Sequence, residues 1–412
     1  MRALGYQDVL WNISVAPNGE GFAIAMYGEE HELFDGLQGR TSVPLFPIDL
    51  SMLLGRSAKS TDRWTAERVQ TAVSAHVGRQ LWEAVPPEVK DALPLGPQVR
   101  LKIASDVPAV GDLPWEWLTD GLGPPFALRP GFTLVRSVPL RFPVPPISID
   151  PPLRVLLVVP NPKDQLSVDA GREIDVAMQA LGSAIYNVNV LDLSELEQIV
   201  AALATEPNIV HYIGHGGLNH GEGNVILQDA NGRSRWVSAT DVATRLPSSV
   251  RLLCLATPFT AHNYQVLGLS HLARATTGTP LPTTVANQYP IGEKPSAAFW
   301  SGFYSSLGSD GNVNDAIQAG RSSAATADPV YADWASFSLV VRDQTGVSFE
   351  VRPTHDAAER RAAEYRAQFA AEAANDLATQ VQVLGDEASS GLKQQYAFEQ
   401  KRATELLDSL EE

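Results

Sequence analysis

The stretch IVHYIGHGGLNHGEGN, residues 209–224, holds the densest set of side chains that can do chemistry. Its His215 lies between Gly214 on one side and Gly216 and Gly217 on the other. Glycines around a histidine let the backbone turn sharply and leave its amides open to a ligand. A histidine in such a turn can act as a general base, and nearby amides can bind an oxyanion. We therefore take His215 as the candidate base and the three glycines as candidate binding residues.

A nucleophile for this base is harder to find. The only cysteine of the chain, Cys254, lies in RLLCLATPFT (251–260), an apolar run that predicts a buried strand continuing into a loop at Pro258. At about 3.3 Å per strand residue, Cys254 lies roughly 13 Å before Pro258, and a histidine activates a thiol only within about 3 Å. We expect Cys254 to be a small buried apolar side chain. Thr257 and Thr260 flank the turn, but a threonine nucleophile usually takes an N-terminal amine as its base.

Three histidines in the same region raise the alternative of a metal hydrolase. His211 and His215 have the spacing H-x-x-x-H, which brings two histidines to one metal only on a helix. His211 falls within NIVHYIG, which has the composition of a strand, so we expect a core or supporting role for it. His220 is expected to be a solvated loop residue. We predict neither a metal nor another cofactor.

Strand and helix patterns alternate from residue 153 to about 345. LRVLLVVP is almost entirely apolar, which is typical of a parallel strand covered on both faces. SELEQIVAALATE predicts a helix with a capping box formed by Ser194 and Glu197. The alternation predicts an α/β fold with a mostly parallel sheet and helices on both faces. In such sheets the site lies at the carboxyl ends of the strands.

The flanking regions have different compositions. RFPVPPISIDPP (141–152) is rich in proline, so we interpret it as a linker without regular structure. Apolar residues recur every four positions after residue 355, which predicts a helical hairpin or an arm that binds a partner. The predicted domains are a smaller α+β part at 1–150, an α/β domain at 151–352 and the helical tail at 353–412.

Charge and composition exclude several classes of partner. The net charge is -16 and the pI about 4.9, which argues against general binding to nucleic acid or to an anionic membrane. One cysteine cannot form an internal disulfide, and no apolar run is long enough for a signal peptide or a bilayer span. We expect a cytoplasmic protein.

Several segments, in their order and spacing, resemble the CHAT family of caspase-like cysteine peptidases of clan CD. These segments are NIVHYIGHGG, VILQDANGR, VRLLCLATPFTA, TTVANQYPI and WASFSLVVRD, preceded by LPWEWLTD, so that the resemblance covers roughly residues 100–345. It implies that His215 matches the family base. It also implies that Pro258 stands where the family has its nucleophilic cysteine, because LATPFTA aligns with the family pattern L-x-x-C-x-T-A. His262 and Asn263 follow in a loop that would flank the substrate, although a plain loop leading into a helix explains them as well.

Proline supplies neither a nucleophile nor a backbone N–H, so the departure at Pro258 changes the expected function. The resemblance then implies a pseudopeptidase that acts as a binding, scaffold or regulatory component in a bacterial signalling or defence assembly. Its expected partner is a protein or peptide, such as an active peptidase or a sensor, with the helices of 355–412 as a candidate interaction surface. The alternative is an active endopeptidase in which His215 works with an unconventional nucleophile.

Overall fold

The computed structural model describes residues 6–15, 22–27, 33–41, 70–94, 98–105, 107–111, 113–137, 147–165, 170–181, 185–192, 195–219, 222–256, 283–289, 291–341 and 349–351, and twelve positions of the tail. The chain divides into two compact units, residues 1–351 and 352–412. The predicted domain boundary at 150 stays a prediction. The sheet of the first unit takes strands from both sides of that position. Among the described residues, no helix is both long enough and apolar enough to span a bilayer.

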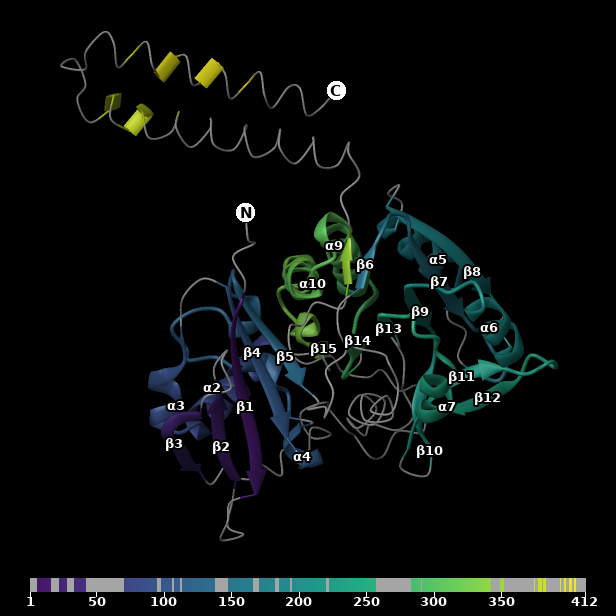
Figure 1. The fold of residues 1–412 in the computed structure, drawn as a ribbon, viewed down its shortest axis with the longest axis horizontal. Coiled ribbons are helices and arrows are strands. Elements are labelled where there is room, and N and C mark those ends of the chain that lie inside the picture. The colour runs from purple at the N-terminus through teal and green to yellow at the C-terminus, as the bar shows by residue number, and fades with distance from the viewer. Residues whose placement is uncertain are drawn as a thin grey trace. The chain divides into compact units, whose positions relative to one another are not determined.

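An eleven-stranded sheet forms the centre of the first unit (Figure 1). In spatial order its strands are β3 (Leu33–Thr41), β2 (Phe22–Tyr27), β1 (Gln7–Val15), β4 (Val99–Ser105), β5 (Phe132–Ser137), β15 (Phe337–Val341), β14 (Thr283–Asn287), β13 (Leu252–Ala256), β9 (Ile209–Ile213), β7 (Leu153–Val159) and β8 (Tyr186–Asp192). All neighbours are parallel except in the pairs β14–β15, β1–β2 and β2–β3. The prediction of a mostly parallel sheet is confirmed.

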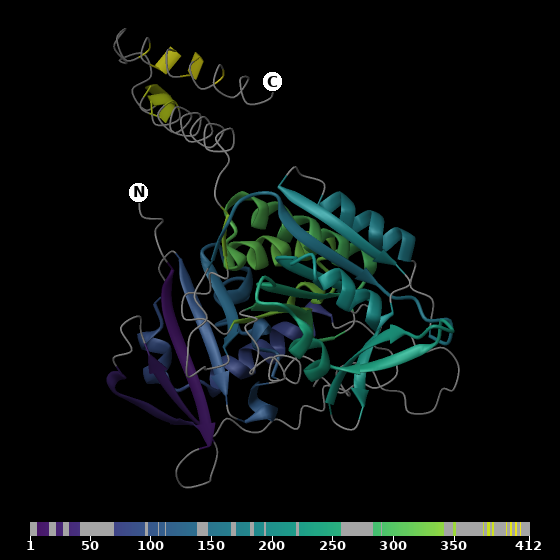
Figure 2. The same cartoon turned by 45° about the vertical axis from the view of Figure 1, so that its right-hand side comes forward.

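Helices cover both faces of this sheet, as the alternation in the sequence predicts (Figure 2). Leu252, Cys254 and Ala256 of β13 belong to one apolar cluster, which includes side chains of α5 (Ala170–Ala180), α9 (Glu293–Asp310) and α10 (Val313–Ala327). Leu253 and Leu255 face the other way, into a cluster with α6 (Leu196–Leu203), α7 (Ala239–Arg245) and β11 (Glu222–Gln228). The strand β13 is therefore covered on both sides, which its unbroken apolar run requires.

Smaller elements complete the unit. They are α2 (Thr71–Ala84), α3 (Pro87–Ala92), α4 (Pro108–Gly111), the 3-10 turns η1 (Trp115–Trp117), η2 (Phe126–Leu128) and η4 (Asp333–Ser336), the ribbon of β10 (Gly216–Asn219), β11 and β12 (Ser234–Ser238), and the pair β6 (Ile147–Ile149) with β16 (Phe349–Val351). The strand β6 lies inside the proline-rich segment, so the prediction of no regular structure there is wrong. The three residues of β6 include no proline, and they pair with β16.

The N-terminal end of α6 also differs from the prediction. Glu195, not Ser194, is the N-cap, and Gln198 rather than Glu197 closes the capping box. An isolated bridge pairs Glu195 with Gln228, and the backbone of Glu195 is extended, as an N-cap requires. The pairing with β11 thus places the cap one residue later than the sequence motif suggests.

A buried ion network joins segments that lie far apart in the sequence. Glu116, in LPWEWLTD, is completely buried. Arg136 donates to its carboxylate from Nε at 3.1 Å and Nη2 at 2.5 Å, Gln288 donates from Nε2 at 2.7 Å, and the Ser338 hydroxyl donates as well. Arg321 lies 3.7 Å away. Burial raises the pKa of Glu116, but the charge and hydrogen bonds of Arg136, with Arg321 and Ser338, outweigh it and hold the pKa below its usual value.

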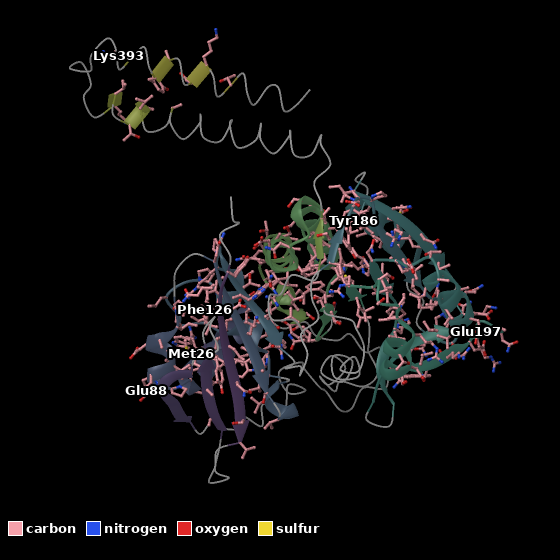
Figure 3. All side chains as sticks on the ribbon, in the orientation of Figure 1. Met26, Glu88, Phe126, Tyr186, Glu197 and Lys393 are labelled. Carbon is pink, nitrogen blue, oxygen red and sulfur yellow. The ribbon has the colours of Figure 1, made fainter. Side chains whose placement is uncertain are left out.

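The second unit, residues 352–412, is helical at each described position: 374, 377–379, 381–382, 393, 396–397, 400–401 and 404. Ala374 is buried, whereas Leu377, Val381 and Tyr396 are half-buried. Lys393 is exposed (Figure 3). These positions fit the predicted helices with one apolar stripe.

Candidate functional site

The carboxyl ends of β9 and β13 lie side by side at the candidate site. Their parallel register pairs His211 with Cys254 and Ile213 with Ala256. The Gly214 N–H then donates to the Ala256 carbonyl at 3.0 Å, so pairing continues one residue past β9. His215 follows directly, beside the point where β13 ends. This brings the predicted base to the predicted edge of the sheet.

The backbone of His215 is held on two sides, and the residue is only 5% exposed. Its carbonyl accepts a hydrogen bond from the Tyr212 hydroxyl at 2.6 Å and another from the Ile226 N–H at 2.9 Å. Because Ile226 belongs to β11, the small ribbon fixes the histidine on the central sheet. An imidazole held in this way can act as a general base towards a group placed at the ends of β9 and β13.

The glycines around His215 have roles that the sequence pattern does not reveal. A Cβ on Gly214 would lie 2.7 Å from the Tyr212 hydroxyl, so glycine is needed there for close approach of the phenol. Its N–H is taken by Ala256 and is not open to an oxyanion. Gly216 and Gly217 pair with Val225 and Asn224 in the β10–β11 ribbon. Sequence reasoning missed this ribbon, because its glycines suggest a loop.

Cys254 lies far from the histidine tip. It pairs with His211, four residues before His215, and four strand residues span about 13 Å. The thiol is completely buried, and burial, opposed by a hydrogen bond with Tyr304, raises its pKa to about 12. A buried thiol with this pKa is almost entirely protonated at neutral pH and is a poor nucleophile. The expected role of Cys254 as an inert core residue agrees with this geometry.

Comparison with known proteins identifies the family of this chain. The model of the CHAT domain matches residues 75–343, which is more than half of the chain. The chain belongs to the CHAT domain family. Two structures of the separase–securin complex of Saccharomyces cerevisiae match 67% and 66% of it at 15% and 13% identity, with TM-scores of 0.39 and 0.37. The Drosophila initiator caspase Dronc matches 48% of it and 82% of its own chain, at 11% identity and a TM-score of 0.30.

The extent of these matches is uneven. This CHAT chain spans 17% of the separase chains. No curated protein matches it at a significant level. The match to residues 75–343 establishes the family, and the sheet itself shows the α/β fold, whereas the activity has to be argued from the site.

Part of the predicted site lies outside the described residues. Pro258, His262, Asn263 and His220 are in this group, so their predicted roles stay predictions. Among the residues that the structure describes, no three His, Cys, Asp or Glu side chains are grouped as metal ligands would be. In this CHAT domain, His215 follows the end of β9. Cys254 is buried inside β13, about 13 Å back along the strand direction.

The interior histidine, His211, belongs to an apolar group beneath α9. Its Nδ1 shares a hydrogen bond with the Tyr304 hydroxyl at 2.9 Å, and its ring packs on Trp300 with centroids 4.4 Å apart. Burial lowers its pKa to about 3, so the ring stays neutral. The hydroxyl of Tyr186 in β8, a residue labelled in Figure 3, in turn donates to the Tyr304 carbonyl at 2.8 Å. The expected core position of His211 agrees with this packing, although its Nε2 has no partner among the described residues.

Proposed function

We propose that this CHAT-domain chain is a pseudopeptidase, a caspase-like body that binds a protein or peptide without cutting it. The proposal includes a scaffold or regulatory role in a cytoplasmic bacterial signalling or defence assembly, with an active peptidase or a sensor as the partner. That part is supported by the family resemblance alone. The chemical part is supported by the site.

The observation that carries the proposal is the register of β13 on β9. It places the only thiol of the chain opposite His211, and burial removes that thiol from both substrate and base. The sequence that follows β13 is Thr-Pro-Phe-Thr, in which Pro258 takes the position of the family cysteine. A base thus remains at the tip, and the group that it would activate is missing.

The first experiment restores that group. We expect the native protein to leave a proteome-derived peptide library uncut and to resist a thiol-directed peptidyl electrophile, as measured by intact mass. In Pro258→Cys, we expect labelling at position 258 that is faster than labelling of free cysteine at the same pH. His215→Ala in the same background should remove this acceleration, because the thiol loses its base.

Two controls make the result decisive. Cys254→Ala should label like the native protein, since the buried thiol does not contribute. Native labelling at Cys254, or peptide cuts that vanish in His215→Ala, would establish the rival active peptidase and overturn the proposal. Equal labelling of Pro258→Cys with and without His215 would show that position 258 is not the family nucleophile position.

The tail offers the second part of the proposal, a surface for a partner. If residues 355–412 form an arm, their deletion should leave the melting temperature nearly unchanged and abolish association with the partner protein. A drop of several degrees in the melting temperature would show that the tail is part of the folded body instead.

A further inference from the structure

An apolar pocket lies on the face of the sheet opposite α9 and α10. Its walls are side chains from the sheet, from α6 and α7, and from β11, and almost the whole of its inner surface is apolar. The pocket encloses about 40 Å³. One water needs only about 10–15 Å³, so the space holds a group of several atoms, and an apolar cavity of this kind favours a ligand over water.

The pocket is built on the two strands that carry the candidate site. Tyr212 of β9 and Leu253 and Leu255 of β13 form its floor. The Tyr212 hydroxyl lies 2.6 Å from the His215 carbonyl, to which it donates its single hydrogen, and 2.9 Å from the Ile226 carbonyl. One side chain therefore forms part of the pocket wall and also holds the histidine tip.

A single charged residue lines the pocket. Arg245, in the last turn of α7, donates from Nη1 to the carbonyl and to the carboxylate of Asp241, at 2.8 and 3.3 Å. Among the described residues its Nε and Nη2 donate no hydrogen bond, and its charge also acts on Glu197. A guanidinium with unused donors beside an apolar space is complementary to a carboxylate on a short apolar body.

We propose that this pocket binds a small carboxylic acid with a branched or compact apolar body, and that binding stiffens the His215 tip through Tyr212. The apolar body lies against Leu253, Leu255 and Val200, and the carboxylate pairs with Arg245. The proposal does not depend on whether the tip cuts peptides, since no step of it uses the base or a nucleophile.

The test uses 4-methylpentanoate as the probe, because its branched end has the size of a leucine side chain, and 4-methylpentanamide as the uncharged match. Calorimetry on the full chain should show binding of the acid about two- to fivefold tighter than the amide, the size expected of an ion pair that solvent partly screens, since Arg245 is 41% exposed. Arg245→Gln should remove that difference. Hydrogen exchange of the Ile226 amide should slow when the acid is bound, since this amide donates to the His215 carbonyl.

Matched variants separate the pocket from the surface. Val200 lines the pocket and is 44% exposed, so Val200→Trp can fill the mouth without disturbing the core, and it should abolish binding. Val330→Trp, at a 60% exposed site away from the pocket, and Arg235→Gln should bind as the native protein does. Absence of binding, equal affinity for acid and amide, binding that survives Val200→Trp, or unchanged exchange at Ile226 would each overturn the proposal.

Discussion

Two buried regions of this molecule, one around Glu116 and one around Cys254 and His211, respond to burial in opposite ways. Glu116 is completely buried and stays charged, because two arginines, an amide and a hydroxyl surround its carboxylate. Cys254 and His211 are just as buried and stay neutral, because among the described residues their side-chain hydrogen bonds go to the uncharged Tyr304 and burial disfavours their charged forms. Burial by itself thus fixes no protonation state; the number and charge of the partners decide. The following predictions test this contrast, from the largest expected effect to the smallest.

Loss of the Glu116 charge should have the largest effect. Glu116→Gln leaves the guanidinium of Arg321 buried without its counter-charge, and the second arginine, Arg136, loses its charged partner too. Breaking a buried pair in this way typically costs about 3–5 kcal/mol of the free energy of unfolding. Urea denaturation followed by tryptophan fluorescence measures it, and a loss below about 1 kcal/mol would contradict the assignment of Glu116 as the centre of the network.

His211 should make the protein sensitive to mild acid. Its folded pKa of about 3 lies below the ordinary value of 6.5, so the unfolded chain binds this proton first as the pH falls. Stability is therefore fully present above pH 6.5 and declines as the pH falls towards 3, by up to about 1.4 kcal/mol per pH unit. Glu116, whose pKa is also lowered, adds a loss of the same sign only in the more acidic part of this range.

A double variant isolates the histidine. His211→Phe with Tyr304→Phe removes the titrating ring together with the hydroxyl that is hydrogen-bonded to it. The free energy of unfolding of this variant should change less between pH 6.5 and 5 than that of the native protein. Parallel curves would mean that His211 is already protonated in the folded state, or that other groups cause the acid response.

Cys254→Ala should cost less, about 1 kcal/mol, as expected for a small buried apolar group. The Tyr304 hydroxyl keeps His211 as a partner in this variant, so no polar atom loses its last hydrogen bond. Thermal unfolding in reducing buffer measures the change. A loss of several kcal/mol would show that the thiol contributes more than its packing.

The exposed pair of Glu197 and Arg235 should give the smallest effect. Its nitrogen and oxygen are 2.9 Å apart, as close as in many buried pairs, but both side chains are largely in water. Such pairs contribute little, because solvent screens the charges. Glu197→Gln should unfold at the same urea concentration as the native protein, and a clear shift would weaken the contrast drawn from Glu116.

The sequence predicts the strands and helices of this fold better than it predicts their partners. Largely apolar runs identify β7, β9 and β13, because strands covered on both faces have few alternatives. The β10–β11–β12 ribbon was missed, since glycines at 214, 216 and 217 suggest a turn. The network around Glu116 was also missed, because its members come from segments that only the folded sheet brings together. A glutamate between two tryptophans was the one local signal of it.

For the candidate site, the Gly-His-Gly pattern was enough to place His215 at the end of a central strand. The same pattern does not show that Gly214 is there to admit Tyr212, or that its amide is already used. Such contacts depend on register between strands, which no local pattern specifies. The distance of Cys254 from the tip was predictable, because it needs only the rise per residue along one strand.

The order of the strands also has a consequence for synthesis of the chain. Because β5 pairs with β15, the sheet cannot be completed until residues up to about 341 have left the ribosome. Ser338 is 222 residues behind Glu116, an interval of about 10 s or longer at common rates of translation. Throughout that time the nascent chain carries a carboxylate without its later partners and a strand edge that can pair wrongly. A long separation in sequence between contacting residues therefore leaves a strand edge and a carboxylate exposed for a time during synthesis. This is the period in which binding by a chaperone would protect the chain most.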